Sequence, residues 1–387
     1  MYWIYCLALL FGTSLLERGY FSAIAYKLSL FILFIFVTGN YYNGIDWINY
    51  QHHYELIVQG SGSTDFFAYE PGFMLILYFF GTVVNIENFH AVVFFSSTVA
   101  VLSIIKFIKI IPFRFNRSLF LFSTIAFIYP LFNDAIRQLL AFSILLPLLP
   151  KIRDCSLKKI IIICLFASLF HASAILMIPV LILLRIQFTK HNMILLFIFS
   201  AVFVILLLSL PVLIMSMSGI IPNYIYSKLV SYLLKTTELK LGLFSIIDCI
   251  GILIIFLSHR RDNRGELDKN LYAMGAYLFF LFHLAFYTAP FLQRLLYYIF
   301  PLVILYANFI FSRSQIFSVT KTLLPITLIM TLSVFFRNIT NPYYIYDLNN
   351  PKFFYSNLFQ NNPINIDHLK ASKCMVISEI DPEFCPR

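Results

Sequence analysis

Charged and polar side chains interrupt the long apolar runs of this chain at a few positions, and these residues carry its most distinctive chemistry. They are Asp46, Glu70, Asp134, Arg137, His171 and Arg294. Ionisable groups at membrane depth are costly to bury, and they usually mark a transport pathway or a binding site. The arginines could bind an anion, whereas the carboxylates and the histidine could take or give a proton.

Two arginines lie where apolar helices are expected to begin. A cation in the first helical turn opposes the helix dipole, so it requires an anion nearby. For Arg137 this anion is either Asp134, three residues earlier in the chain, or a ligand. For Arg294 the alternative is a long side chain that snorkels to the membrane surface. Because guanidinium groups and helix N-termini both suit phosphate, the two arginines predict a diphosphate clamp, with Gln138 and Tyr297 as neighbouring binding residues.

The carboxylates and the histidine are candidate catalytic groups. Asp46 and Glu70 bound a polar loop rich in Tyr and His, and either could act as a general base toward a hydroxyl. Asp134 lies where it could cap a helix, and His171 lies in the middle of the apolar stretch 160–184. Each has a plainer explanation, because a loop carboxylate is often only solvated and a histidine inside a helix often only packs.

Two aromatic residues of the same polar loop, Trp47 and Tyr50, are candidate substrate-binding residues. Aromatic side chains in this setting form a belt at the membrane–water interface. They also provide flat faces on which sugars stack. The sequence leaves both interpretations open.

The elements that must position these residues are transmembrane helices. The chain has 387 residues, of which 60% are hydrophobic and 12% are charged, and its mean hydropathy is +0.84. A spanning helix needs ~20 mostly apolar residues, so the expected fold is an all-α, polytopic integral membrane protein with roughly 11–13 transmembrane helices. The expected spans are 2–16, 21–39, 71–86, 89–105, 118–132, 135–149, 160–184, 193–215, 241–258, 270–289, 295–312 and 321–336.

The expected organisation is one membrane domain followed by a short tail. Residues 1–340 form the membrane domain, with extracytoplasmic loops at about 40–70 and 216–240. Within the second loop, apolar residues at helical spacing predict an interfacial amphipathic helix over 222–240. Residues 341–387 form a polar tail, which is expected to be periplasmic.

Basic clusters between the spans predict the orientation. Lys and Arg concentrate in cytoplasmic loops, so the candidate site should face the opposite side of the membrane. This assignment requires 160–184 to leave and return as a broken helix or tight helical pair, and one segment between 71 and 117 not to cross. The clusters occupy 106–117, 151–159, 260–269 and 313–321.

Motifs for other chemistry are absent from the sequence. It has no Walker A loop, HExxH, CxxC, GxSxG or DxD pair, so no metal and no cofactor is expected. The net charge of +10 is scattered between spans, which argues against nucleic-acid binding. Cys374 and Cys385 lie together in the tail and could form a disulfide in an oxidising compartment.

Taken in order, several short motifs resemble the EpsG-like family of Wzy-type polymerases, which build bacterial surface polysaccharides. The family often has Thr where this chain has Ile45. The resembling segments are Gly44-Ile45-Asp46 with Tyr50 and Tyr54, Tyr69-Glu70-Pro71-Gly72-Phe73, Ile136-Arg137-Gln138-Leu139-Leu140-Ala141, His171-Ala172-Ser173-Ala174, and Arg294-Leu295-Leu296-Tyr297-Tyr298.

This resemblance implies a multi-pass glycosyltransferase of the bacterial inner membrane, with its active site facing the periplasm. It would join repeat units linked to undecaprenyl diphosphate, without a metal. Arg137 and Arg294 would stabilise the diphosphate leaving group, and Asp46, Glu70, Asp134 and His171 are the candidates to act on the acceptor hydroxyl. The expected partners are the lipid-linked oligosaccharide, membrane lipid and a chain-length regulator protein.

Three other functions compete with polymerisation. An O-antigen ligase uses the same class of donor but a different acceptor. A flippase or other transporter of lipid-linked oligosaccharides would show internal repeats and charges along a full crossing path, whereas here the charges gather at one expected face. A membrane-bound O-acetyltransferase is supported by His171 alone.

Overall fold

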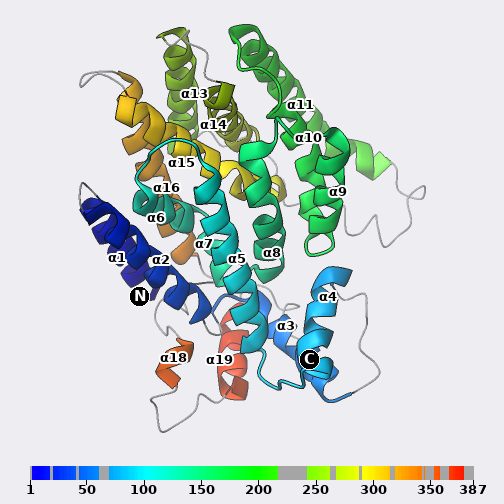
Figure 1. Cartoon of the computed structure of the whole chain (residues 1–387). Coiled ribbons are helices and arrows are strands. Elements are labelled where there is room, and N and C mark those ends of the chain that lie inside the picture. Colours follow the sequence, from blue (N-terminus) through cyan, green and yellow to red (C-terminus); the bar gives the residue numbers. More distant parts are fainter. Residues whose placement is uncertain are drawn as a thin grey trace.

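The regular structure of the computed structural model is helical throughout the residues that it describes, apart from an isolated β-bridge between Asn40 and Phe353 (Figure 1). The predicted all-α class is therefore confirmed. The described residues are 2–17, 21–40, 43–60, 69–216, 242–261, 267–286, 290–313, 319–341, 344, 353–357 and 366–378.

The helices of the first half of the chain surround the candidate site. In chain order they are α1 (Tyr2–Leu16), α2 (Ser22–Thr38), α3 (Asp46–Val58), α4 (Pro71–Tyr78), the π-helix η2 (Phe79–Val83), α5 (His90–Ile110), α6 (Arg117–Phe127), α7 (Tyr129–Asn133), α8 (Ile136–Leu145), the 3-10 helix η3 (Leu146–Lys151), α9 (Leu157–Ser168), the 3-10 helix η4 (Ala172–Leu176) and α10 (Met177–Leu183).

The helices of the second half pack beside them. They are α11 (Lys190–Ser216), α13 (Leu243–Arg261), α14 (Leu267–Ala285), the 3-10 helix η6 (Pro290–Leu295), α15 (Leu296–Arg313), the 3-10 helix η7 (Val319–Thr322), α16 (Leu323–Ile339), α18 (Phe354–Asn357) and α19 (Ile366–Ser378).

The outer surface of these helices suits a lipid environment. Within the described residues, His90–Ile110 and Leu292–Ser312 are long and apolar enough to cross a membrane, and nine other apolar helices are 10–17 residues long. Large hydrophobic side chains also point outward, among them Phe31 and Ile205, which are 62% and 66% exposed. Such faces are unfavourable in water and favourable against acyl chains, which supports a membrane protein.

Proline divides two of the predicted spans into shorter pieces. The stretch 118–132 forms α6 and α7, with Pro130 in the first turn of α7. The stretch 135–149 forms α8 and then tightens into η3, which contains Pro147 and Pro150. Proline lacks an N–H and removes a helical hydrogen bond, so the helices break where the hydropathy stays high.

The stretch 160–184 is a helical hairpin, as expected if the basic loops on both sides of it are cytoplasmic. Helix α9 runs to a turn at His171, and η4 with α10 returns beside it. Arg153, just before α9, donates hydrogen bonds to the carbonyls of Leu184 and Ile186, which follow α10, at 3.4 and 3.2 Å. Both ends of the hairpin therefore lie together, and the turn with His171 lies at the opposite end.

The predicted span 71–86 does not cross the helix bundle. Its residues form the short pair α4 and η2, and the chain then returns at Ile86, whose carbonyl accepts a hydrogen bond from Tyr54 of α3. The loop 40–70 also contains a helix, α3, where no regular structure was expected. Hydropathy alone could not separate this re-entrant pair from a full span.

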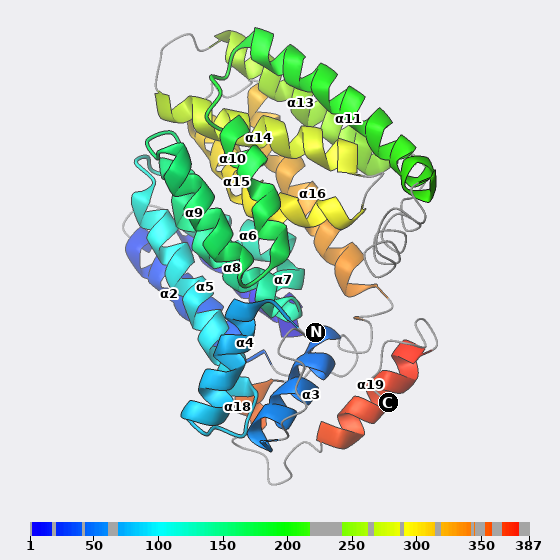
Figure 2. The same ribbon diagram turned by 90° about the vertical axis from the view of Figure 1, so that its right-hand side faces the viewer.

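The basic loops and the candidate site lie at opposite ends of the bundle. Phe113, in the basic loop between α5 and α6, packs on Tyr272 at the start of α14 and on Phe309 near the end of α15. At the other end, Figures 1 and 2 show α3, α4, α18 and α19 gathered around the start of α5. This end holds the residues singled out from the sequence.

The C-terminal tail folds onto the membrane domain at this same end. Phe353 forms the β-bridge to Asn40, and its ring lies so close to Gly39 that a side chain there would collide. Cys374 of α19 is disulfide-bonded. Cys385 and the predicted amphipathic helix 222–240 lie outside the described residues.

Candidate active site

Arg137 is the centre of a polar network between four helical elements. It stands in the first turn of α8, and its NH1 atom donates to Oε2 of Glu70 at 2.6 Å. Its Nε atom donates to the hydroxyl of Tyr50 at 3.1 Å. The guanidinium carbon lies 4.8 and 5.4 Å from the ring centroids of Tyr69 and Tyr50, within cation–π range. The anion that pairs with Arg137 is thus Glu70, not Asp134.

Glu70 joins Arg137 to the turn of the helical hairpin. It is the N-cap residue of α4, and its Oε1 accepts the backbone N–H of Ala172 at 3.1 Å. The N–H of Gly72 donates to the carbonyl of Leu169 at 2.7 Å, and a Cβ at Gly72 would lie 2.8 Å from that oxygen. Burial raises the pKa of Glu70, but the Arg137 charge and the Ala172 N–H outweigh it and hold the pKa below its usual value.

His171 lies at the hairpin turn with a defined hydrogen-bonding pattern. Its Nδ1 accepts the backbone N–H of Ser173 at 3.3 Å and lies 2.7 Å from the Ser173 hydroxyl. That hydroxyl lies 3.2 Å from the hydroxyl of Tyr298 on α15. Because Nδ1 is an acceptor, the neutral imidazole carries its hydrogen on Nε2. His171 is therefore better placed to donate a hydrogen bond through Nε2 than to act as a base there.

Asp134 holds the first turn of α3. Its Oδ1 accepts the backbone N–H groups of Ile45 and Asp46 at 2.7 and 2.6 Å, and its Oδ2 accepts the hydroxyl of Tyr344 at 3.0 Å. Gly44 adopts φ +80°, and a side chain there would collide with Asp134. This carboxyl satisfies helix donors that α3 leaves unpaired. Burial and the nearby Asp46 charge raise the pKa of Asp134 to about 8.

Helix α3 carries the other candidate carboxylate. Asp46 is partly exposed, and its Oδ2 accepts the hydroxyl of Tyr50, which connects it to Arg137. Trp47 and Tyr50 are only 3% and 2% exposed. Neither ring is open for stacking on a sugar or for a place in an interfacial belt, because both belong to a packed aromatic cluster.

Arg294 lies in the last turn of η6, one residue before Leu295 ends it and α15 begins, and its side chain is exposed. Gln138 donates from Nε2 to the backbone carbonyl of Arg294 at 3.1 Å, so the starts of α8 and α15 are joined. The Arg294 charge acts on His171, which places it beside the network. Tyr297 is half-buried and packs against the ring of Phe127.

The structure thus brings the singled-out charged residues together at one end of the bundle. Sequence reasoning quoted Ser173 and Tyr298 in the resembling segments without giving them a site role, and it missed Tyr344, because their roles depend on contacts between distant segments. It also missed Asp248 and His283, which form a buried pair between α13 and α14. The rule that flags ionisable residues in apolar runs would have found this pair. Within the described residues, no group of three His, Cys, Asp or Glu side chains is arranged to hold a metal ion.

A model of the EpsG family matches residues 24–350. The chain belongs to the EpsG family. Neither a curated protein nor a solved structure matches it. The EpsG match includes every residue of the polar network, and it ends before α19. Membership supports a general role of the polysaccharide-polymerase type in a membrane protein.

Proposed function

We propose that this EpsG-family protein polymerises polysaccharide repeat units linked to undecaprenyl diphosphate, at the periplasmic face of the bacterial inner membrane. The observation that carries the proposal is the convergence of Arg137 and the exposed Arg294 at the starts of two helices at one end of the bundle. Cations and helix N-termini at one place suit a diphosphate. The partners are the lipid-linked oligosaccharide, membrane lipid and a chain-length regulator.

The reaction is a glycosyl transfer with a lipid diphosphate as leaving group. The acceptor hydroxyl oxygen bonds to the anomeric carbon of the donor sugar, and the bond from that carbon to the diphosphate oxygen breaks. The leaving diphosphate keeps the electron pair. Its negative charge is stabilised by Arg294, by Arg137 and by a hydrogen bond from His171 Nε2. In this scheme the protein supplies the positive charge, and the reaction needs no metal.

The three carboxylates have different roles in this scheme. Glu70 uses both oxygens to hold Arg137 and the hairpin turn, so it positions the arginine. Asp134 holds the start of α3. Asp46 is partly exposed and accepts the hydroxyl of Tyr50. It is therefore the carboxylate that takes the proton of the acceptor hydroxyl.

An apolar groove beside the network provides a place for the lipid chain. Its volume is about 700 Å³, and its walls continue the elements that carry the polar residues. Helix α8 contributes Leu140 and Ile144, three and seven residues after Arg137 and so on one helix face. Helix α4 contributes Leu75, which is 62% exposed, and the hairpin contributes Phe170. An anionic head at Arg137 with an apolar tail in this groove matches a polyprenyl diphosphate.

The orientation rests on the basic loops. They lie at the end of the bundle opposite the network, and loops rich in Lys and Arg favour the cytoplasm. The network would then face the periplasm. A reporter fused to the loop between α5 and α6 tests this, since activity of a periplasm-specific reporter there would reverse the assignment.

The proposed function is tested by surface polysaccharide from a deletion strain, separated on a gel. A polymerase predicts that the deletion leaves the lipid A core with a single repeat unit, and that wild-type protein restores the long ladder. Core without any repeat would indicate a ligase or a flippase instead. An unchanged ladder in the deletion would remove the protein from polymer assembly.

A further inference from the structure

The C-terminal helix α19 lies beyond the segment that matches the EpsG family, yet it packs against the polar network. Figure 2 shows α19 beside α3 at the end of the molecule that holds the site. Leu369 of α19 is 5% exposed and belongs to the same apolar cluster as Trp47 and Tyr50. Lys373, one helical turn later, points the same way and is 1% exposed.

Lys373 is an unusual residue to bury. Removing an ammonium group from water is costly unless charges or polar groups surround it. Its Nζ atom lies 5.4 Å from the ring centroid of Trp47, within cation–π range. Trp47 directly follows Asp46, and it lines the same small cavity as Asp134. The lysine therefore lies over the first turn of α3, and its charge acts on Asp134.

The charge of Lys373 acts on Asp134. It lowers the pKa of that carboxyl, against burial and the repulsion of Asp46, which together raise it. Within the described residues, the other titratable groups near Asp134 include Tyr344, which donates to Oδ2, Tyr50 of α3, and His90 of α5, which lines the same small cavity. Lys373 and Tyr344 thus bring two segments of the C-terminal region onto one carboxyl, and that carboxyl holds the first turn of α3.

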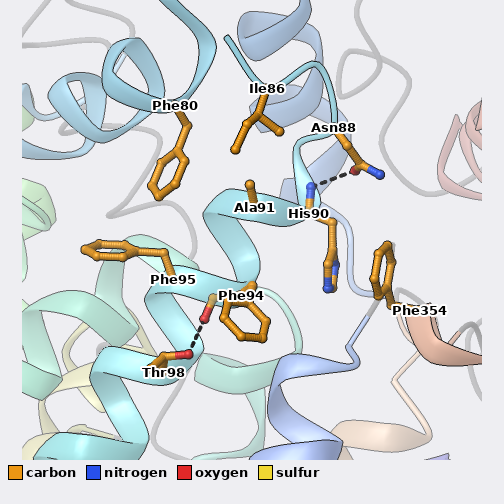
Figure 3. A pocket seen from close by; sticks show the side chains of 9 residues that line it. All are labelled: Phe80, Ile86, Asn88, His90, Ala91, Phe94, Phe95, Thr98 and Phe354. Atoms are coloured by element: carbon orange, nitrogen blue, oxygen red, sulfur yellow. Dashed lines mark hydrogen bonds between the residues drawn. The ribbon is translucent and has the colours of Figure 1, made fainter. Parts of the chain in front are cut away.

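The tail between Tyr344 and Lys373 is anchored to the membrane domain by contacts of its own. Phe354 stacks on the ring of His90 at the start of α5, with ring centroids 3.7 Å apart and planes 9° apart (Figure 3). Its ring forms one wall of an apolar pocket of about 490 Å³. The hydroxyl of Tyr355 lies 2.8 Å from that of Thr38. A segment held at these points can fix the approach of α19.

We propose that α19 is a clamp on the active site, and that Lys373 is its positioning residue. By lying over Trp47 and acting on Asp134, it holds the start of α3 so that Tyr50 stays against Arg137 and Asp46 stays hydrogen-bonded to Tyr50. The effect of α19 on polymer formation rests on the proposed function, whereas its effect on the geometry of α3 is independent of that function.

The clamp is tested by the fluorescence of Trp47 in the purified full-length protein. The chain has two tryptophans, so Trp3→Phe leaves Trp47 as the sole reporter. In that background Lys373→Met should shift the emission to the red and increase quenching by acrylamide. Lys370→Met, a change at a partly exposed lysine of the same helix, is the matched control and should leave both unchanged. If Trp3→Phe does not fold, the difference between parent and Trp47→Phe gives the same signal.

A pH titration separates positioning from simple packing. The emission of Trp47 should change with pH as Asp134 loses its proton, with a midpoint near pH 8. Asp134→Asn should abolish this change. Lys373→Met should move the midpoint upward, and Lys373→Arg should restore it. An unchanged midpoint and unchanged quenching in Lys373→Met would overturn the clamp.

The same variants separate the clamp from the proposed function. Lys373→Met should reduce polymer roughly tenfold to a hundredfold, since small misplacements of catalytic groups have effects of that size. If the wild type forms no polymer while the fluorescence results hold, the proposed function fails and the clamp stands. Wild-type polymer levels in Lys373→Met, at equal protein in the membrane, would overturn the clamp's role in the site.

Discussion

Two pairs of ionisable residues within the apolar bundle differ in their exposure and in their connections to other elements. The side chains of Arg137 and Glu70 are 22% and 18% exposed, and both make further hydrogen bonds to other elements. The pair of Asp248 and His283 is 0% and 4% exposed, with Nδ1 to Oδ2 at 2.7 Å. The ring of Phe279 stacks on His283, with centroids 5.8 Å apart.

The difference is consistent with the proposed ligand site at Arg137 and with a packing role for the buried pair. A partly exposed arginine can exchange or share its partner with an incoming anion without a buried charge being left alone. A fully buried pair cannot do so, because removing either partner takes away a hydrogen bond that water cannot replace in an apolar medium. Charge at membrane depth therefore indicates function only where exposure and a connected network accompany it. The buried pair fixes how α13 and α14 pack.

The largest effect on polymer formation is expected from Arg137→Ala. The change removes the cation of the network and leaves Glu70 without its partner. Loss of one preorganised charge donor typically costs about 100- to 1,000-fold in rate, so the polymer ladder should disappear. Gel analysis of the complemented deletion strain measures this. Arg185→Ala, at an exposed arginine of the opposite end, is the control and should give normal ladders.

Arg294→Ala should have the next largest effect and lower polymer formation about tenfold to a hundredfold. One of the two arginines of the proposed diphosphate site is then lost, while Arg137 remains. The side chain of Arg294 is exposed, so thermal unfolding in detergent should stay at the wild-type temperature. A loss of polymer that only mirrors a loss of stability would contradict a direct role in binding the diphosphate.

Substitutions of Asp134 distinguish its role as a hydrogen-bond acceptor from the effect of its charge. Asp134→Asn keeps Oδ1 as acceptor for the N–H groups of Ile45 and Asp46, so polymer should fall by only a few-fold, roughly the loss of about 1 kcal/mol. Asp134→Ala removes the acceptor and should cost more. Equal activity of the two variants would show that Asp134 does not act by holding α3.

The pH dependence of stability has a definite sign at Asp134. The pKa of this group is 3.8 when unperturbed and about 8 in the folded protein, so the folded state holds the proton more tightly. Its contribution is complete below the lower value and is lost as the pH rises to about 8. Thermal unfolding between about pH 5 and 9 should show this decline in wild type and a flatter profile in Asp134→Asn. Identical slopes would count against a raised pKa.

The smallest effect on polymer per folded molecule is expected at the buried pair. Asp248→Leu removes the carboxylate that His283 Nδ1 contacts at 2.7 Å, and it should lower the free energy of unfolding by about 1–3 kcal/mol. Joint replacement of both residues by leucine should recover much of that stability. Polymer formed per folded molecule should change by less than about twofold in either variant. A larger change would give this pair a role in the reaction.

The sequence predicts the parts of this structure that depend on local chemistry. Arg137 in a first helical turn and the break at His171 both follow from residue type and hydropathy. The partnership of Arg137 with Glu70 does not, because it joins residues far apart through three-dimensional packing. The same applies to Tyr344 and Lys373, which reach the site from the tail. The stretch 71–86 is apolar enough to be predicted as a span, and no feature of the local sequence indicates that the chain turns back within it.

The central claim is tested most directly with the purified protein and a polyprenyl-diphosphate-linked repeat unit. Polymer and released polyprenyl diphosphate are measured together for wild type and Arg137→Ala. The account predicts that the wild type releases one lipid diphosphate for each linkage formed, and that Arg137→Ala forms neither product. Polymer without released lipid diphosphate, or a wild-type rate in Arg137→Ala, would contradict it.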